Sequence, residues 1–467
     1  MDEEKDSKIK SFAEDRIPPL IIKLAAPMII AQLVNVLYSL ADRVFIAHIP
    51  NHSILALSAV GLCFPLITLI FGLTNLLGPG GLTLFSMELG RKKHERAQVI
   101  LQHAYYLLFY CSIILVIICY SALDPILIFC GARDEALPFA RAYMSIYLFG
   151  TPALMLSTGL SVYLSAQGRA RDAMISIVLA ALANIGLDYF FIFILKMGIE
   201  GAAIASVISQ YGAAIFVVCR LRSQHVGIRL VLRGFHWNLE CVRSIISLGS
   251  AGFIFQATNA LVQTLFNHRL YVYGGDLHIS IMNILNTIRA LMVTFVSGLT
   301  SASHPIISYN YGAGNPERVR KTIRFTFHLS LTFTLVMWII IQLRPGLFLA
   351  LFENESSQFL KEGTYAMQIY YSTFFMMSLQ FIGQTVFLGL GLAKEAIFFS
   401  LLRKIILIIP MTLILPNFIF PQIWGIYWAD PVSQVIGSLA TFCFMLLRLK
   451  QCLAPLDKSP LSRQNLA

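Results

Sequence analysis

The chain is poor in charged residues for its length. Only 13% of its 467 residues are Asp, Glu, Lys or Arg, whereas 57% are hydrophobic and the mean hydropathy is +0.72. In soluble globular domains about a quarter of all residues are charged. The composition therefore excludes such a domain and indicates an integral membrane protein. Apolar segments of about 20 residues recur along the chain and leave no room for a soluble domain between them.

The sequence also lacks the usual motifs of catalysis and metal binding. Its eight cysteines form no CxxC pair and lie mostly in apolar segments, so we interpret them as packing residues. HExxH and GxSxG are absent, and we expect neither an enzyme nor a cofactor. Residues 1–17 lack the apolar core and cleavage site of a signal peptide, so we expect the first membrane helix to stay attached.

The apolar segments predict an all-α protein with twelve transmembrane helices. We expect them at 18–48, 54–79, 97–121, 138–166, 173–195, 199–221, 241–271, 278–303, 320–343, 363–390, 395–415 and 421–448. Basic clusters near 91–96, 169–171, 220–233 and 318–321 then fall on one side, whereas loops 48–53, 271–278 and 415–422 contain no Lys or Arg. The positive-inside rule predicts a plasma (inner) membrane protein with both termini in the cytoplasm. The net charge of +11 therefore reflects topology, and we expect no nucleic acid partner.

Several motifs occur twice at a nearly constant spacing. "SMELGRKKHERA" matches "SYNYGAGNPERV" with Ser86 and Ser308 in register, 222 residues apart, and Gly201 and Gly425 are 224 apart. The repeat predicts two pseudo-symmetric six-helix lobes of equal orientation around a central cavity, an arrangement that suits alternating access. A scaffold duplicated for size is the alternative. The predicted segments are an N-terminal tail 1–17, lobes 18–222 and 241–449, a cytoplasmic linker 223–240 and a C-terminal tail 450–467.

Polar residues form stripes on several of the predicted helices. In the first helix Asn35, Ser39 and Asp42 share one face, and in the fifth helix Asn184 and Asp188 lie one turn apart. Polar side chains are costly in hydrocarbon, so each stripe should face protein or water. Hydrogen bonding that only holds the helices together is the alternative.

Two acids stand out because they lie inside predicted helices at a common depth. Asp42 and Asp188 are about 10 to 12 Å below the outer surface, at about 1.5 Å per residue, and their repeat partners fall near the neutral Phe266 and Thr412. Binding H⁺ or Na⁺ would remove the desolvation cost of these charges, so we expect a cation switch solvated by Asn35 or Asn184. A structural ion pair is the alternative.

Three further residues complete this interpretation of the helices. Pro27 removes a hydrogen bond from the first helix and predicts a hinge there. Arg43 points about 100° away from Asp42 and is expected to reach the outer interface. Arg289 in the eighth helix, the one deep basic residue, is expected to pair with Asp430, which would neutralise both; contact with substrate is the alternative.

The chain resembles the multidrug and toxic compound extrusion (MATE) family, in its DinF-like branch. The resemblance covers all twelve predicted helices and is most specific in "LVNVLYSLADRVF", "NIGLDYFFIF" and "HPIISYNYGAGNPERVR". It implies that Asp42, Asn184 and Asp188 couple transport to an ion, with Na⁺ held by these three side chains if Na⁺ is the ion, and that Ser206 belongs to the same site.

The resemblance also implies the function. It implies a multidrug efflux transporter that exports amphipathic organic cations by H⁺ or Na⁺ antiport, a monomer whose partners are small cationic drugs or toxins and the lipid bilayer. A wide cavity lined by aromatic, Met and amide side chains would accept such cations. From helix faces we expect it to be lined by Tyr38, Gln256, Asn259, Met282, Asn283 and Phe375. A lipid-linked sugar flippase of the wider superfamily is the alternative, although several basic cavity residues would be expected in it.

Overall fold

Helices make up almost all of the described structure. The computed structural model describes residues 11–49, 53–133, 135–349 and 357–457, and these ranges contain no strand. Within this part of the chain, ten helices are long and apolar enough to cross a membrane. The composition of the sequence predicted this helical membrane architecture.

The chain divides into two compact units. Unit 1 runs to Phe253 and unit 2 starts at Ile254, and the six residues Ile17–Ile22 also belong to unit 2. The division falls inside a long helix. The segment boundaries expected from the sequence, including the linker 223–240, stay a prediction.

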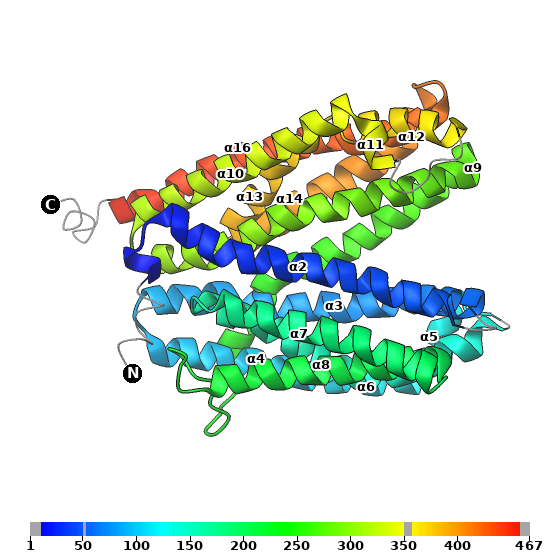
Figure 1. Cartoon of the computed structure of the whole chain (residues 1–467). Coiled ribbons are helices and arrows are strands. Elements are labelled where there is room, and N and C mark those ends of the chain that lie inside the picture. The colour runs from blue at the N-terminus through cyan, green and yellow to red at the C-terminus, as the bar shows by residue number, and fades with distance from the viewer. Residues whose placement is uncertain (1–10, 50–52, 134, 350–356, 458–467) are drawn as a thin grey trace. The chain divides into compact units, whose positions relative to one another are not determined.

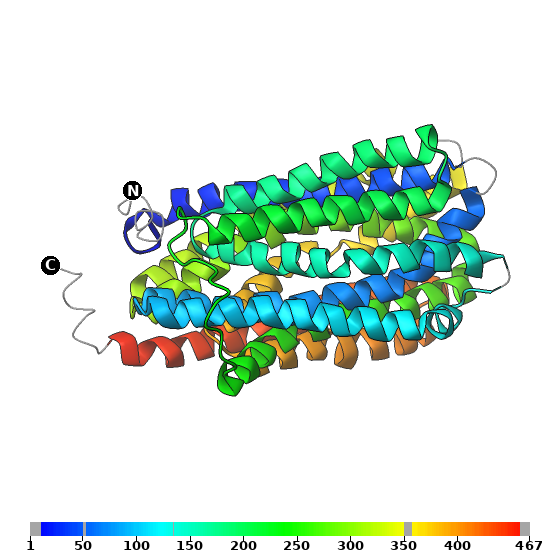
Figure 2. The ribbon, with the colours of Figure 1, turned by 90° about the horizontal axis from the view of Figure 1, so that it is seen from below.

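Unit 1 is built from helices that lie side by side (Figures 1 and 2). They are α2 (Ile17–Ala47), α3 (Ser53–Gly90), α4 (His94–Ser121), the short α5 (Leu123–Phe129), α6 (Ala136–Ala166), α7 (Ala170–Asp188) with its π-helical continuation η1 (Tyr189–Ile194), α8 (Gly198–Arg222) and the start of α9 (Leu239–Gly312). Helix α6 is central, because it packs against α3, α4, α7 and α8.

Small residues allow the close packing of helices in unit 1. A Cβ on Gly78 of α3 would lie only 2.5 Å from the Cα of Gly159 in α6. Close contacts between small residues are typical of membrane helices, whose association depends on packing rather than on a hydrophobic effect. The glycines therefore fix the distance between α3 and α6.

Unit 2 continues from α9 to the end of the described chain. Its further elements are α10 (Pro316–Leu343), α11 (Pro345–Leu349), α12 (Ser357–Tyr370), the 3₁₀ turn η2 (Phe374–Met376), α13 (Met377–Gly389), α14 (Ala393–Leu401), the π-helix η3 (Leu402–Ile408), α15 (Ile409–Ile414), the 3₁₀ turn η4 (Leu415–Asn417) and α16 (Gln422–Asp457). Gly275, at φ 62° and ψ −161°, interrupts α9.

The described elements account for the twelve predicted spans. Helix α9 contributes two helices that meet at Gly275, and α12 with α13 forms one span interrupted around η2. Together with the other long helices, this gives twelve spans in the part of the chain that is described, six before Leu239 and six after it. The predicted fold class, an all-helical membrane protein with two six-helix lobes, is confirmed.

Three helices extend well beyond their predicted ends. Helix α3 reaches Gly90 rather than 79, α9 reaches Gly312 rather than 303, and α16 reaches Asp457 rather than 448. Hydropathy detects the hydrocarbon core, whereas a helix can continue past it while its backbone bonds are satisfied. A local signal starts α10, where the Asn315 side chain accepts from the Arg318 backbone N–H at 3.2 Å and Pro316 follows the cap.

The segment between α8 and α9 is packed against unit 1. Gln102 Nε2 donates to the Val231 carbonyl at 2.7 Å, and the Tyr106 hydroxyl donates to the Leu232 carbonyl at 2.7 Å. The Ile228 side chain is buried as well. This segment is thus part of the folded unit.

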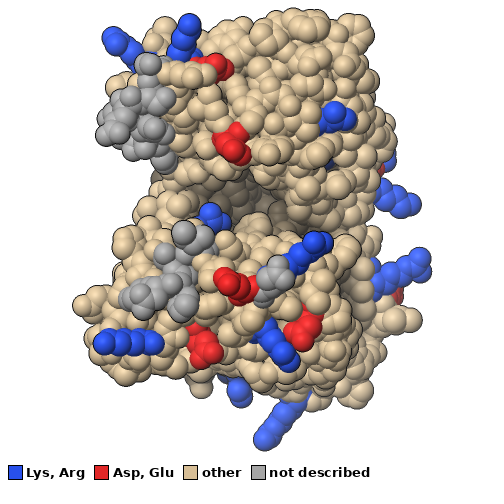
Figure 3. All heavy atoms as spheres, turned by 90° about the vertical axis from the view of Figure 1, so that its right-hand side faces the viewer, with Lys and Arg blue, Asp and Glu red and all other residues tan. Residues whose placement is uncertain are grey.

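The opposite end of unit 1, where α5 lies, carries charges of both signs. Arg141 and Asp124 form an exposed ion pair there with a distance of 3.3 Å between Nε and Oδ1. Figure 3 looks onto this end of the helices and shows Lys or Arg as well as Asp or Glu side chains among uncharged ones.

Candidate functional site

The polar stripe of α2 lines a cavity inside unit 1. The cavity has a volume of about 350 Å³, and Asn35, Tyr38, Ser39 and Asp42 contribute to its wall. These residues follow the helical spacing of three and four residues on which the predicted stripe rests. The stripe therefore faces an open space within the unit.

Four further aromatic side chains contribute to the wall of this cavity. Tyr143 and Tyr147 of α6 are buried in its wall, and Phe64 and Phe71 of α3 also line it. Aromatic rings attract cations through their negative faces. Unit 1 thus combines an acid with several aromatic side chains in one cavity wall, a combination that suits a positively charged group.

Asp188 and Asn184 lie at the end of α7 and are almost completely buried. Asp188 is 0% and Asn184 1% exposed. In the orientation that gives both amide atoms a partner, Asn184 Nδ2 donates to Asp188 Oδ2 at 2.8 Å and Asn184 Oδ1 accepts from the Ser206 backbone N–H at 3.2 Å. Directly after Asp188 the chain changes to the π-helix η1, a local irregularity that is frequent at functional sites.

The two acids share one electrostatic environment. Asp42 and Asp188 are near enough for their charges to repel each other, and Arg43 is near enough to attract the charge of Asp42. One oxygen of each carboxyl group is buried without a hydrogen-bond partner among the described residues. A buried carboxylate without a compensating cation is costly. The pair is therefore chemically suited to bind a proton or a small cation.

Arg43 does not compensate for the charge of Asp42 by direct pairing. In the described structure no ion pair joins the two side chains, although Arg43 also lines the cavity of unit 1. Arg43 is also exposed, and its expected position at the outer interface stays a prediction.

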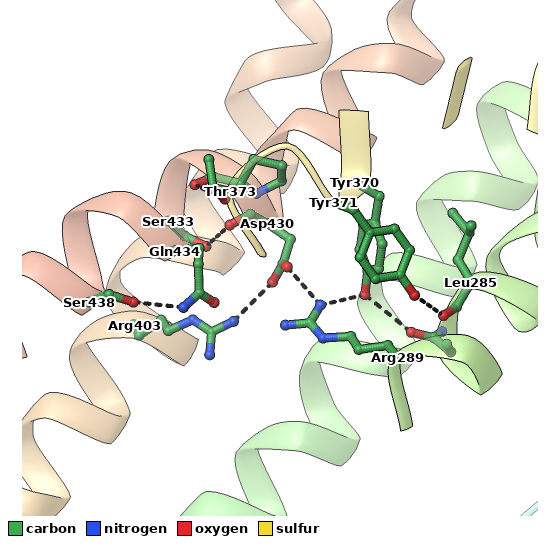
Figure 4. A network of polar contacts seen from close by, with 12 residues as sticks. Leu285, Arg289, Tyr370, Tyr371, Thr373, Arg403, Asp430, Ser433, Gln434 and Ser438 are labelled. Atoms are coloured by element: carbon green, nitrogen blue, oxygen red, sulfur yellow. Dashed lines mark hydrogen bonds and ion pairs between the residues drawn. The ribbon is translucent and has the colours of Figure 1, made fainter. Parts of the chain in front are cut away.

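Unit 2 contains a second cavity, of about 380 Å³. Asp430 of α16 lines this cavity and lies between two guanidinium groups (Figure 4). Arg289 Nη1 donates to Asp430 Oδ2 at 2.7 Å, and Arg403 Nη2 donates to Asp430 Oδ1 at 3.2 Å. Arg289 also donates to the Tyr370 hydroxyl at 2.6 Å, which in turn donates to Asn286 at 3.2 Å. The predicted pair of Arg289 and Asp430 is confirmed.

The cavity of unit 2 also contains two basic residues absent from the predicted site. Arg403 and Lys404 lie in η3 and line the cavity together with Arg289. The expectation that Arg289 is the one deep basic residue, neutralised by Asp430, is wrong, because Arg403 shares the Asp430 carboxylate and Lys404 lines the same cavity. The signal was present in the sequence, since an Arg-Lys pair in the middle of the apolar segment 395–415 must find polar surroundings.

The predicted substrate contacts separate into three groups. Tyr38 lines the cavity of unit 1, and Asn259 and Met282 line that of unit 2. The remaining residues line neither of these two cavities: Gln256, Asn283 and Phe375. Of these, Asn283 is exposed, and Phe375 packs against Trp338 with ring centroids 5.4 Å apart. Helix faces alone did not separate cavity residues from others, and the role of all six stays a prediction.

The predicted hinge and cation ligands have clear positions in unit 1. Pro27 is buried within α2, which is helical from Ile17 to Ala47, so bending there stays a prediction. Among the described residues no group of three or more His, Cys, Asp or Glu could hold a metal ion. The expected Na⁺ ligands are two carboxylates, Asp42 and Asp188, and the amide of Asn184.

In the part of the chain that the structure describes, twelve helical spans in two units, each unit with a polar cavity, define a membrane transport protein. The MatE family model matches residues 27–190 and again residues 251–414, and the chain belongs to this family of transporters, which are not enzymes. The two matches are shifted by 224 residues at both ends, which confirms the internal repeat.

Similar proteins extend over nearly the whole chain. The multidrug export protein MepA of Staphylococcus saprophyticus and that of Staphylococcus aureus are each 22% identical over 443 residues, 95% of this chain and 96% of theirs. Two solved structures have the same fold. A MATE transporter in the bent conformation is 21% identical with a TM-score of 0.90, covering 97% of this chain and 99% of its own. An outward-facing MATE family transporter of the MOP superfamily is 22% identical with a TM-score of 0.87, covering 93% and 96%.

Proposed function

We propose that the protein is a secondary active multidrug efflux transporter that exports amphipathic organic cations in exchange for H⁺ or Na⁺. Its family and the relatives named as multidrug export proteins support this function. The observation that carries the proposal is the acid pair Asp42 and Asp188, each with an unpartnered buried oxygen, beside a cavity whose wall includes several aromatic side chains.

Cation binding would change the energy of the acid pair. Without a bound cation, two negative charges repel each other in a poorly hydrated site, and H⁺ or Na⁺ removes this repulsion. The empty and occupied states then favour different packings of α2, which carries both Asp42 and Pro27. Export would follow from alternating access in which the outward-facing state releases the drug and takes up the ion.

The number of exchanged charges decides which gradient drives export. The exchange of one entering proton for one leaving monovalent cation is electrically neutral. Only the pH gradient then drives export, and it supplies about 1.4 kcal/mol per pH unit. If both carboxyl groups carry a proton inward, one net charge also moves down the potential, which adds about 2.3 kcal/mol per 100 mV. The presence of two acids at one site supports the second stoichiometry.

The proposal includes a location and an orientation. The transporter would lie as a monomer in the plasma (inner) membrane, with both termini in the cytoplasm and no cofactor. The basic residues Arg91, Arg169 and Arg220 support this orientation, because they lie at the ends of α3, α6 and α8 that would face the cytoplasm.

Uptake of a fluorescent organic cation into everted membrane vesicles tests the function. A pH gradient and a Na⁺ gradient are imposed separately on vesicles with wild type, Asp42→Asn or Asp188→Asn. We expect both variants to lose gradient-driven uptake. Glu317→Gln is the control, because Glu317 forms an exposed pair with Lys321 outside both cavities. If both Asn variants take up the fluorescent cation as fast as wild type, the coupling site is refuted. If wild type responds to only one of the two gradients, that gradient identifies the coupling ion.

A lipid-linked sugar flippase is the second candidate, and one observation favours it. The three basic residues Arg289, Arg403 and Lys404 around the cavity of unit 2 suit the phosphate groups of such a lipid. Reconstituted vesicles with a fluorescent polyprenyl-diphosphate sugar distinguish the two functions. Its translocation without export of organic cations would support the flippase.

A further inference from the structure

We propose that the cavity of unit 2 is a binding site for the anionic group, a carboxylate or a phosphate, of an amphipathic molecule. The site is distinct from the cation site proposed in unit 1 and has the opposite polarity. It is built from residues of unit 2 alone, so the inference does not depend on the cation exchange proposed above.

The charges in this cavity do not balance. Arg289, Arg403 and Lys404 are three basic side chains in its wall, and Asp430 is the one acid that lines the cavity with them. Both oxygens of Asp430 are already occupied, one by each guanidinium group (Figure 4). Two guanidinium groups share this one carboxylate, and an excess of positive charge in a poorly hydrated site is costly. A bound anion would remove much of this cost.

Lys404 is the basic side chain with free donors. In the described structure it forms no ion pair and no hydrogen bond, and its Nζ lies 5.8 Å from the centre of the Phe255 ring. An ammonium group has three donors and no acceptor, so it needs acceptors such as carboxylate or phosphate oxygens. The ring attraction alone leaves these donors available to a ligand.

Arg403 is held in place with one donor unused. Its side chain is 3% exposed, and its Nε is buried without a hydrogen-bond partner. The stem packs on α16 at Gly437, where an added Cβ would lie 3.0 Å from Arg403 Cβ. A π-helix has more residues per turn than an α-helix, so the consecutive residues Arg403 and Lys404 can both line one cavity.

The remaining wall is suited to the apolar part of a ligand. Phe255, Phe266, Met377 and Phe381 line the cavity beside the charged residues. A volume of about 380 Å³ lies in the range of small-molecule sites, which combine apolar walls with a few polar anchors. A flat hydrophobic body with one acidic group therefore matches the composition of this cavity.

The basic residues are a feature of the second repeat. With the shift of 224 residues, Arg289, Arg403 and Lys404 correspond to Pro65, Leu179 and Ala180, all of them uncharged. Asp42 and Asp188 in turn correspond to Phe266 and Thr412. The two halves thus carry charges of opposite sign at different positions, which supports a separate ligand chemistry in unit 2.

Binding of two probes with the same aromatic body tests the proposal. Full-length protein in nanodiscs of neutral phosphatidylcholine is titrated with 1-pyrenebutyrate and with 1-pyrenebutylamine by calorimetry, with empty nanodiscs as the blank. We expect the carboxylate to bind at least about tenfold more tightly. Lys404→Gln should weaken its binding by about ten- to a hundredfold, because a charged partner is lost, and should leave the amine unchanged within about twofold.

The variants separate the site from general effects on folding. Lys404→Gln leaves every hydrogen bond of Asp430 in place, and Arg403→Gln keeps Asp430 paired with Arg289. The matched control is Lys394→Gln, an exposed lysine in α14 outside the cavity, which should bind both probes like wild type. Asp42→Asn should also keep binding 1-pyrenebutyrate, even if it abolishes export of organic cations.

The outcomes have defined meanings. Equal affinity for both probes, or an unchanged affinity of Lys404→Gln for 1-pyrenebutyrate, would overturn the proposal. Adding polyprenyl phosphate to the nanodiscs identifies the source of the anion. If polyprenyl phosphate competes with 1-pyrenebutyrate for wild type but not for Lys404→Gln, the ligand is a lipid phosphate. If it does not compete for wild type, the ligand is a small organic acid.

Discussion

Asp430→Asn should destabilise unit 2 strongly. The substitution keeps the size of the side chain but removes the carboxylate that accepts from Arg289 at 2.7 Å and from Arg403 at 3.2 Å. An amide has one acceptor oxygen, so one guanidinium group would face the NH₂ donor. Removing one partner of a buried ion pair costs about 3–5 kcal/mol, because the remaining charge stays buried. Arg403, 3% exposed, cannot turn towards solvent.

A second carboxylate of the same helix is the matched control. Asp457, at the end of α16, pairs with Arg320 at 2.5 Å, but the two side chains are 42% and 43% exposed. An exposed ion pair contributes about 0–1 kcal/mol and is screened by salt. Asp457→Asn should therefore change the free energy of unfolding by no more than about 1 kcal/mol.

Unfolding of the purified variants in mixed micelles with increasing SDS measures both effects. The expected result is a much lower midpoint for Asp430→Asn than for Asp457→Asn, with only the small effect at Asp457 decreasing at high salt. Equal midpoint shifts of the two variants would refute the reasoning, because burial would then not determine how much an ion pair contributes to stability.

Three smaller perturbations test other features of the fold. Gly437→Ala should displace Arg403, whose Cβ would lie 3.0 Å from the new methyl group, and should weaken binding of 1-pyrenebutyrate in the calorimetric titration. Gly275→Ala should cost about 1–3 kcal/mol in the SDS titration, because φ 62° with ψ −161° is accessible mainly to glycine. Tyr106→Phe removes the hydrogen bond to the Leu232 carbonyl and should speed protease cleavage within 223–238. It should change the free energy of unfolding in SDS by no more than about 1.5 kcal/mol.

The acid site shows how far sequence patterns reach. Asp42 and Asp188 were recognisable because few acids lie inside the apolar segments, and helical spacing placed Asn35 and Ser39 on the same face as Asp42. The structure places these three residues of α2 at one cavity and Asn184 beside Asp188. Spacing within one helix is a local property, so the sequence sufficed for this much.

Contacts between distant helices were less predictable. The pair of Arg289 and Asp430 could be inferred because both residues lie at a similar depth. Arg403 and Lys404 fall in a π-helix, which the regular spacing of an α-helix does not describe, and their relation to the cavity was missed. The same limit applies to Gln256, Asn283 and Phe375, whose helix faces were known but not the neighbours of those faces.

By itself, the sequence determined the helical membrane fold, the internal repeat and the acid pair of the first half. These properties depend on composition, periodicity and spacing along the chain, which are fixed before any tertiary contact forms. Only the tertiary structure decided that a second cavity exists and that its charge is positive. The sign depends on which side chains from α9, η3 and α16 meet around Asp430, and packing of helices far apart in the sequence sets that meeting.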